Sequence, residues 1–310
     1  MSPRTKLWVA LGTVYTIWGS TYLGIALAVE TMPPLFAVST RFVVAGALLG
    51  AIVAWRRGPG SLRLNRREFA AVALVGVLFN GANALLFFAE ETIPIGLASL
   101  IIASVPLWVA VFRILAGDQP PRIVLAGIVT GFVGVALLVH PSGEAQWEGV
   151  LLVVASAFAW SVGSFLSPRL PLPANSATAT SYQMGIGGLV FLPIGLASSP
   201  HPSEFSTRSI LGWLYLVVFG AIVGYTAYVW LLAHAPISVA ATYAYVNPVI
   251  AISLGAVVLD ESITTQIVFG ATIVLTSVAV VVRREPPTAE PAPLPAEAPP
   301  PAAGETTIGR

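Results

Sequence analysis

The sequence predicts an all-α integral membrane protein with ten transmembrane helices, arranged as two inverted repeats of five helices each. Three observations predict this fold class: the apolar composition, the number of apolar runs long enough to span a bilayer, and an internal repeat. Of the 310 residues, 56% are hydrophobic and only 9% are charged, whereas about 25% of residues are charged in an ordinary soluble domain. We therefore expect most of the chain to lie in a lipid bilayer.

The apolar runs define the expected helices. A helix needs about 20 mostly apolar residues to cross a bilayer. The first run follows Arg4 and Lys6 but has no convincing small-residue cleavage site, and more spans follow it, so we interpret it as a transmembrane helix and not a signal peptide. The expected spans are residues 7–29, 34–55, 68–90, 95–116, 121–140, 147–168, 177–198, 209–232, 237–258 and 265–282.

These spans divide the chain into four parts. Residues 1–6 form a short N-terminus, residues 7–140 the first repeat of five helices, and residues 147–284 the second repeat. The last part, residues 285–310, is rich in proline and alanine without apolar periodicity, which predicts a disordered tail.

The basic residues predict the orientation. Lys and Arg collect on the cytoplasmic side of membrane proteins. With the N-terminus inside, all but two of the 15 basic residues are cytoplasmic; Arg208 lies outside and Arg41 lies within a span. We therefore expect both termini in the cytoplasm, at a multi-pass cytoplasmic membrane.

The internal repeat appears at an offset of 142 residues. This offset relates Trp18 to Trp160, Pro106 to Pro248, and other pairs that include Ser39 with Ser181, Gly46 with Gly188, Pro94 with Pro236, Ala98 with Ala240, and Asp118 with Asp260. Because each copy holds an odd number of helices, the second enters the membrane from the opposite side. Inverted repeats of this kind are typical of carriers that work by alternating access.

Composition also excludes several kinds of chemistry. The formal net charge of +1 offers no general attraction to nucleic acid. The chain has no cysteine, and its three histidines, His140, His201 and His234, are far apart, so we expect no metal site and no cofactor. It contains neither an HExxH motif nor a phosphate-binding P-loop, which argues against an enzyme and against direct use of ATP.

Two prolines mark the expected substrate cavity. A proline within a helix leaves the carbonyl four residues earlier without its donor, here those of Ile102 and Ala244. Such carbonyls are tolerated in a membrane where they face protein or a wet cavity. Tyr243 and Asn247 share a helix face beside Pro248, so we expect this face to line a cavity; the alternative is a simple bend with Asn247 bonded to a neighbouring helix.

Further polar and aromatic side chains are candidates for the same cavity. Tryptophans near span centres lie away from the interfacial belt that they usually occupy, and buried amides in lipid need partners. The full set of predicted substrate-binding residues is Trp18, Ser20, Thr21, Asn80, Asn83, Ser104, Trp108, Trp160, Ser164, Tyr225, Tyr228, Tyr243 and Asn247.

Charges within the spans predict a gate. Arg41 lies about 10 Å below the outer end of its helix, at 1.5 Å per residue, and intramembrane charges mark functional sites. Glu30, Glu90 and Glu91 end helices on the same side, so we expect Arg41 to pair with one of them. A structural ion pair, snorkelling to the interface, a gate and a substrate-carboxylate contact all remain open for Arg41. Because the repeat places glutamine and leucine at the equivalents of Arg41 and Glu90, our hypothesis is a charged outer gate, weakened by protonation of Glu90, and a neutral inner gate.

Four stretches resemble a known family. They are "IWGSTYLGIALAVETMPPLFAVSTRFVVAGALLG" at 17–50, "AEETIPIGLASLIIASVPL" at 89–107, "AWSVGSF" at 159–165 and "TYAYVNPVIAISLGAVVLDE" at 242–261. They are similar to the EamA-domain carriers of the drug/metabolite transporter superfamily, of the YedA-like kind. The resemblance covers residues 7–284 and implies a ten-helix inner-membrane carrier with the EamA-like fold that exports small metabolites or drugs. Similar proteins often carry a Gly-Glu pair after the fourth helix, where this chain has Gly117-Asp118-Gln119.

The sequence thus predicts a secondary transporter for a small molecule, with amino acids and related compounds or drugs as substrate classes. Protons are a candidate coupling ion, and the bilayer is the expected surrounding; the oligomeric state is open. The alternative functions are a membrane sensor or assembly protein and a channel.

Overall fold

The computed structural model describes residues 2–139, 147–198, 200–234 and 242–284. The described part of the chain is helical and contains no strand. The predicted tail 285–310, the repeat partners Pro236 and Ala240, and His140 lie outside the described residues. In chain order the helices are α1 (Pro3–Val29), α2 (Pro34–Arg57), η1 (Pro59–Leu62), α3 (Arg66–Ala89), α4 (Ile95–Ile102), α5 (Val105–Leu115), α6 (Arg122–Val139), α7 (Trp147–Leu166), η2 (Ser167–Arg169), α8 (Ser176–Ala197), η3 (Pro202–Glu204), α9 (Thr207–Tyr215), η4 (Leu216–Val223), α10 (Gly224–His234), α12 (Tyr243–Val258) and α13 (Thr265–Arg284).

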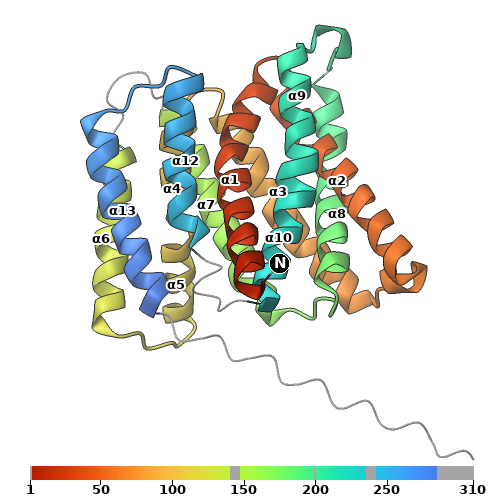
Figure 1. The fold of residues 1–310 in the computed structure, drawn as a ribbon, viewed down its shortest axis with the longest axis horizontal. Helices are drawn as coiled ribbons and strands as arrows, with labels where there is room; N and C mark the ends of the chain where they lie inside the picture. The colour runs from red at the N-terminus through yellow and green to blue at the C-terminus, as the bar shows by residue number, and fades with distance from the viewer. Residues whose placement is uncertain (1, 140–146, 199, 235–241, 285–310) are drawn as a thin grey trace, which may run out of the picture.

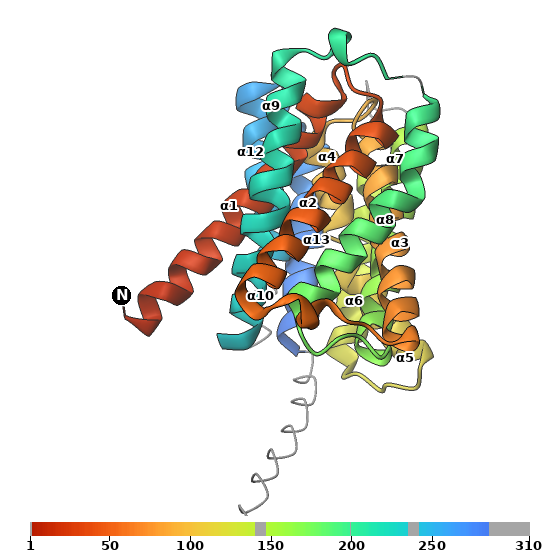
Figure 2. The same ribbon diagram turned by 90° about the vertical axis from the view of Figure 1, so that its right-hand side faces the viewer.

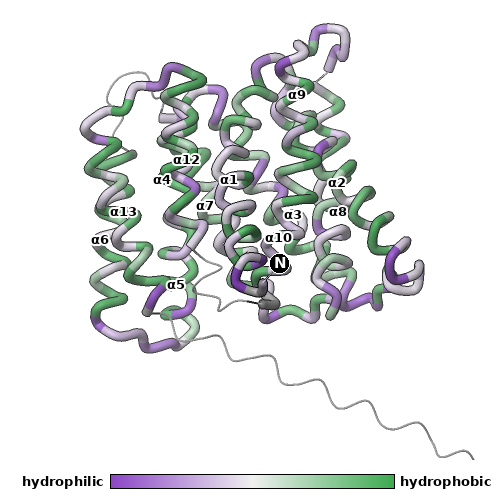
Figure 3. Tube along the Cα trace, in the orientation of Figure 1, coloured by the Kyte–Doolittle hydropathy of each residue, from purple (hydrophilic) through white to green (hydrophobic). Residues whose placement is uncertain are grey.

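The helices form a bundle whose long axes run in roughly one direction (Figures 1 and 2). Figure 3 shows apolar residues along the middles of the helices and hydrophilic residues at many of the turns, as in the segment between α5 and α6. Within the described residues, seven segments are long and apolar enough to cross a membrane. The structure therefore has the character of a multi-pass membrane protein.

The remaining three predicted spans are less clear. The helices α6 and α12 are apolar but shorter than the seven segments. Helix α1 is long, with 27 residues, but the polar side chains of Thr16, Ser20 and Thr21 at its centre lower its hydropathy. The total of ten spans remains a prediction.

Each half of the chain packs on the other in an exchanged pattern. Helix α1 packs against α9, α10 and α12, whereas its counterpart α7 packs against α3, α4 and α5. Helices α2 and α8 lie side by side at one end of the bundle, and α6 and α13 lie side by side at the other (Figure 1). The centre of the bundle is therefore built from helices of both halves.

The contact between α2 and α8 is reciprocal. A Cβ atom on Gly46 would lie 2.8 Å from the carbonyl oxygen of Ser181, and a Cβ atom on Gly188 would lie 2.8 Å from that of Ser39. Gly188 and Ser181 are the repeat counterparts of Gly46 and Ser39. Exchanged contacts of this kind are typical of two surfaces related by a two-fold axis, and the absent side chains allow the two backbones to approach closely.

Candidate functional site

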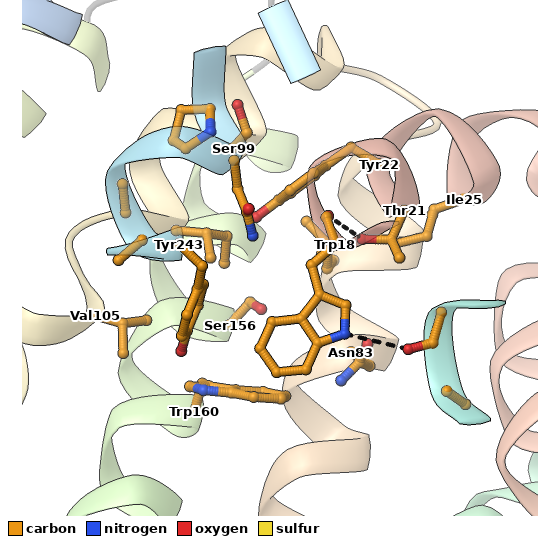
Figure 4. Close-up of a pocket in the computed structure, with 18 of the residues that line it drawn as sticks. Trp18, Thr21, Tyr22, Ile25, Asn83, Ser99, Val105, Ser156, Trp160 and Tyr243 are labelled. Atoms are coloured by element: carbon orange, nitrogen blue, oxygen red, sulfur yellow. Dashed lines mark hydrogen bonds between the residues drawn. The ribbon is translucent and has the colours of Figure 1, made fainter. Parts of the chain in front are cut away.

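A cavity of about 220 Å³ lies between the two halves of the bundle. Its walls come from α1, α2, α3, α4, α5, α7, α8, η4, α10 and α12, and neither α6 nor α13 contributes a lining residue. Figure 4 shows Trp18 of α1, Tyr243 of α12 and Trp160 of α7 around the same space. Of the predicted residues, it is lined by Trp18, Thr21, Arg41, Asn83, Pro106, Trp160, Tyr225, Tyr243, Asn247 and Pro248.

Three aromatic rings close the cavity wall beside α1. The Trp18 ring lies 4.9 Å from the Tyr228 ring and 5.0 Å from the Tyr243 ring, between centroids, and the two tyrosine rings are 5.5 Å apart. The Trp18 indole N–H donates to the carbonyl of Gly220 at 3.3 Å. Tyr228 thus does not line the cavity but supports two residues that do. We name Trp18, Tyr228 and Tyr243 the aromatic cluster.

The second tryptophan is held from the other side. The Trp160 ring stacks on Phe79 of α3 at 4.4 Å between centroids, with an interplanar angle of 28°. A Cβ atom on Gly163 would clash with the Phe79 ring at 2.6 Å. The absence of a side chain at Gly163 therefore leaves room for the Phe79 ring. The stack fixes one face of Trp160 and leaves the rest of the ring beside the cavity.

Both predicted helix distortions border the cavity, and a third was not predicted. Helix α4 ends at Ile102 and α5 begins at Val105, so the helix is interrupted just before Pro106. Pro248 lies within α12, whose described residues begin at Tyr243. Between α9 and α10 the chain forms the π-helix η4, a form that is frequent at functional sites.

Arg41 lines the cavity as a buried cation, with only 5% of its surface exposed. Its Nε and Nη1 have no hydrogen-bond partner in the described residues. Its guanidinium carbon lies 4.7 Å from the centre of the Phe42 ring, a cation–π arrangement. Among the described residues Arg41 forms no ion pair with a carboxylate in this conformation.

The carboxylates expected to pair with Arg41 have other surroundings. Glu30 forms an exposed ion pair with Arg208 of α9, at 3.2 Å. Glu90 is buried, and neither of its carboxylate oxygens has a hydrogen-bond partner in the described residues. Arg41 and Glu261 are the charged groups that act on it electrostatically. Of the three predicted gate residues, only Arg41 lines the cavity.

Several predicted binding residues lie outside the cavity. Ser20 and Ser164 bond to the backbone of their own helices, as serine often does in membrane helices; Ser20 also bonds to the Tyr215 hydroxyl at 2.6 Å. Trp108 packs against two phenylalanine rings of α6 and α7. Ser104 is buried, and its hydroxyl has no hydrogen-bond partner among the residues that the structure describes. Ser20, Asn80, Ser104, Trp108, Ser164 and Tyr228 do not line this cavity, and their role in substrate binding stays a prediction.

The two predicted asparagines of α3 differ. Asn83 lines the cavity and donates to the carbonyl of Phe79, whereas Asn80 donates to the carbonyls of Gly76 and Gln183 and joins α3 to α8. The sequence supplies both amides three residues apart, but only the position of α8 decides which of them meets a neighbouring helix.

Other lining residues were not predicted. Among them Tyr22 lies one helical turn after Trp18, and Ser156 lies one turn before Trp160, so spacing of four residues from a predicted tryptophan points to both. Phe42 follows Arg41 directly, and Met184 follows the repeat partner of Arg41. The remaining unpredicted members are Ile25, Leu86, Ile102, Ala103, Val105, Gly220, Ala221 and Ala244; Ser99, a serine near Pro106 in the sequence, also lines the cavity.

Glu261 has a structural position away from the cavity. Its carboxylate accepts the backbone N–H groups of Ile95 at 2.7 Å and Gly96 at 3.2 Å, at the start of α4. A carboxylate is favoured at a helix N-terminus, where unpaired N–H groups carry partial positive charge. Burial raises the pKa of Glu261, while the two N–H donors oppose this rise. Glu261 thus joins the α12–α13 turn to α4.

Comparisons with known proteins identify the family. The model of the EamA-like transporter family matches residues 6–140 and again residues 147–283. The "uncharacterized inner membrane transporter YedA" of Escherichia coli K12 is 32% identical over 253 residues, covering 80% of this chain and 81% of that protein. The "uncharacterized transporter YvbV" of Bacillus subtilis is 27% identical over 288 residues, covering 90% and 92%. A protein of known crystal structure has the same fold at 20% identity, with a TM-score of 0.62 and coverage of 90% of this chain and 98% of that chain. With both halves matched to one family model, this chain belongs to the EamA-like transporter family.

Proposed function

We propose that this protein is a secondary transporter of the cytoplasmic membrane that exports small metabolites or drugs by alternating access. The observation that carries the proposal is the cavity between the two halves, lined by helices of both and bordered by interrupted helices. Carriers of inverted-repeat architecture bind substrates at such an interface, on discontinuous helices. Membership of a transporter family agrees with this function.

The proposed mechanism uses the two halves as interchangeable scaffolds. The two separate family matches and the reciprocal packing of Gly46 and Gly188 support a pseudo-two-fold relation between them. Under this proposal the halves rock about the α2–α8 contact and expose the cavity to one side of the membrane at a time.

The two ends of the cavity suggest two different closures. The aromatic cluster lies beside the N-terminal half of α1, which the basic residues assign to the cytoplasm. Glu90, with Arg41 as a neighbouring charge, follows α3 at the opposite end. We infer a neutral inner closure and a charged outer closure. Transport by Glu90→Gln with an unchanged pH profile would rule out a coupling role for Glu90.

The size of the cavity favours small cargo. Drug-sized ligands occupy pockets of roughly 300–1,000 Å³, whereas about 150 Å³ holds a benzene molecule. A cavity of about 220 Å³ therefore fits a single ring system with a short substituent better than a large amphipathic drug.

Flux measurement in proteoliposomes tests the proposal. The purified protein is reconstituted and offered labelled amino acids, purine metabolites, organic acids and cationic dyes, with and without a pH gradient. We expect saturable, protein-dependent flux of one class. Binding of a partner protein without any flux would favour the sensor or assembly function, and flux that does not saturate would favour a channel.

A further inference from the structure

The guanidinium of Arg41 is a buried cation in the cavity wall. Only 5% of the residue is exposed, and its Nε and Nη1 have no hydrogen-bond partner in the described residues. Nη2 approaches the η4 backbone, where a Cβ atom on Gly220 would lie 3.2 Å from it. Removing a charge from water without a paired acceptor costs free energy. A ligand that brings a hydrogen-bond acceptor to Arg41 therefore binds more favourably than a ligand of equal size without one.

The residues around Arg41 do not supply a hydrogen-bond acceptor for its Nε and Nη1. Phe42 lies under the guanidinium at 4.7 Å, but a ring face replaces only part of its lost hydration and accepts no strong hydrogen bond. Glu30 is already paired with Arg208. Glu90 acts on Arg41 electrostatically, but the two side chains form no hydrogen bond with each other.

Another lining residue, on α12, supplies an unsatisfied acceptor. Asn247 is 8% exposed, lines the cavity, and its Oδ1 accepts no hydrogen bond in the described residues. A buried amide oxygen without a donor also costs free energy. The same cavity is lined by aromatic side chains, among them Trp18, Trp160 and Tyr243 (Figure 4).

We propose that the cavity binds a small carboxylate with a planar apolar body and an N–H or O–H donor. Arg41 holds the carboxylate, because a guanidinium matches its two oxygens; Asn247 accepts from the donor, and the aromatic walls contact the body. This substrate class deepens the proposed transport function and rests on the same cavity. A cationic or neutral molecule of equal size leaves Arg41 without an acceptor and therefore binds more weakly.

Binding to the unaltered protein tests the proposal first. Calorimetry at neutral pH in detergent compares butyrate, benzoate, phenylacetate and indole-3-acetate, each with its neutral amide. We expect at least one carboxylate to bind about 30-fold or more tightly than its amide, since removal of one partner from a buried charge pair has at least this effect. For indole-3-acetate, its 1-methyl derivative lacks the N–H donor, and we expect it to bind several-fold more weakly. Equal affinities for all carboxylates and amides, or no binding of any carboxylate, would overturn the proposal.

Variants then test whether Arg41 causes the preference for carboxylate over amide. Arg41→Gln should abolish the preference for carboxylate over amide, and Arg56→Gln, which changes an exposed arginine of the same helix, should keep it. A preference that survives in folded Arg41→Gln would contradict the role of Arg41. If Arg41→Gln does not fold, the comparison of acid and amide on the unaltered protein decides.

The same ligands separate this inference from the proposed function. If carboxylates bind with the expected preference but are not transported into proteoliposomes, the carboxylate site is supported and the transport function is refuted. Saturable flux of neutral or cationic solutes, with no binding of carboxylates, would refute the carboxylate site and leave transport intact.

Discussion

At the scale of single residues, two tryptophans show how position in the bundle decides between binding and packing. Both Trp160 and Trp108 lie near span centres, and the sequence marks both as candidates. Trp160 lines the cavity, whereas Trp108 packs between Phe132 and Phe158 at 4.7 and 5.3 Å between ring centroids. The same side chain therefore has different expected consequences when it is removed.

We expect Trp160→Leu to raise the KM of the transported solute about tenfold. An aromatic contact contributes about 0.5–1.5 kcal/mol beyond its buried area, and the upper end corresponds to a factor of about ten in affinity. The matched Trp108→Leu should lower thermal stability and leave KM within about twofold. Concentration-dependent flux and thermal unfolding measure both; equal changes in KM would show that Trp160 does not contact the solute.

Glu261 gives a prediction about stability. Glu261→Gln removes the charge that accepts the N–H groups of Ile95 and Gly96. Hydrogen bonds to charged groups contribute about 1.5–3 kcal/mol, so we expect a loss of this order and a melting temperature lower by several degrees in detergent. Glu204→Gln, at an exposed position of η3, is the control. Equal melting temperatures for both variants would mean that the cap does not hold α4.

The sequence predicts which residues line the cavity only where membership of a helix face determines it. The spacing of Trp18 and Thr21, and of Tyr243 and Asn247, places each pair on one face, and all four line the cavity. Ser20 could not be assigned in this way, because its bond to the Tyr215 hydroxyl depends on where a helix far along the chain comes to lie.

At the scale of elements, the contact between α2 and α8 depends on glycine. We expect Gly188→Ala and Gly46→Ala to destabilise the fold by about 1–3 kcal/mol, the usual cost of overpacking, because each added Cβ would meet backbone atoms at 2.9 Å or less. The same change at Gly12 of α1, where no atom lies within 4 Å, should be neutral or stabilising by up to about 1 kcal/mol. Thermal unfolding of the three variants measures the difference; a stabilising effect at Gly188 would contradict this packing.

Interruptions of helices were predictable only where proline causes them. Pro106 predicts the break between α4 and α5, because proline cannot continue the hydrogen-bond ladder. The π-helix η4 contains no proline and reads as a plain apolar run, "LVVFGAIV". Within it Gly220 lies against Thr21 and Arg41, and such contacts between distant helices are fixed only in the folded bundle.

At the scale of the whole molecule, the absence of cysteine from the chain allows a clean test of orientation. Single cysteines at Gly60 of η1 and Ser203 of η3 are both exposed. With the N-terminus inside, we expect a membrane-impermeant maleimide to label Ser203→Cys in intact cells and Gly60→Cys only after the cells are opened. The reverse pattern would invert the proposed topology.

The most direct test of the central claim, that the cavity between the halves is the substrate site of a carrier, is counterflow in proteoliposomes. Vesicles are loaded with an unlabelled transported solute and placed in a dilute solution of the labelled solute. The label rises transiently above its outside concentration only if one site is exposed to each side of the membrane in turn. We expect transient accumulation of label by the unaltered protein, strongly reduced by Asn247→Ala and unaffected by Arg56→Gln at an exposed position of α2. Uptake that equilibrates without accumulation, or accumulation that Asn247→Ala leaves unchanged, would contradict a carrier that works through this cavity.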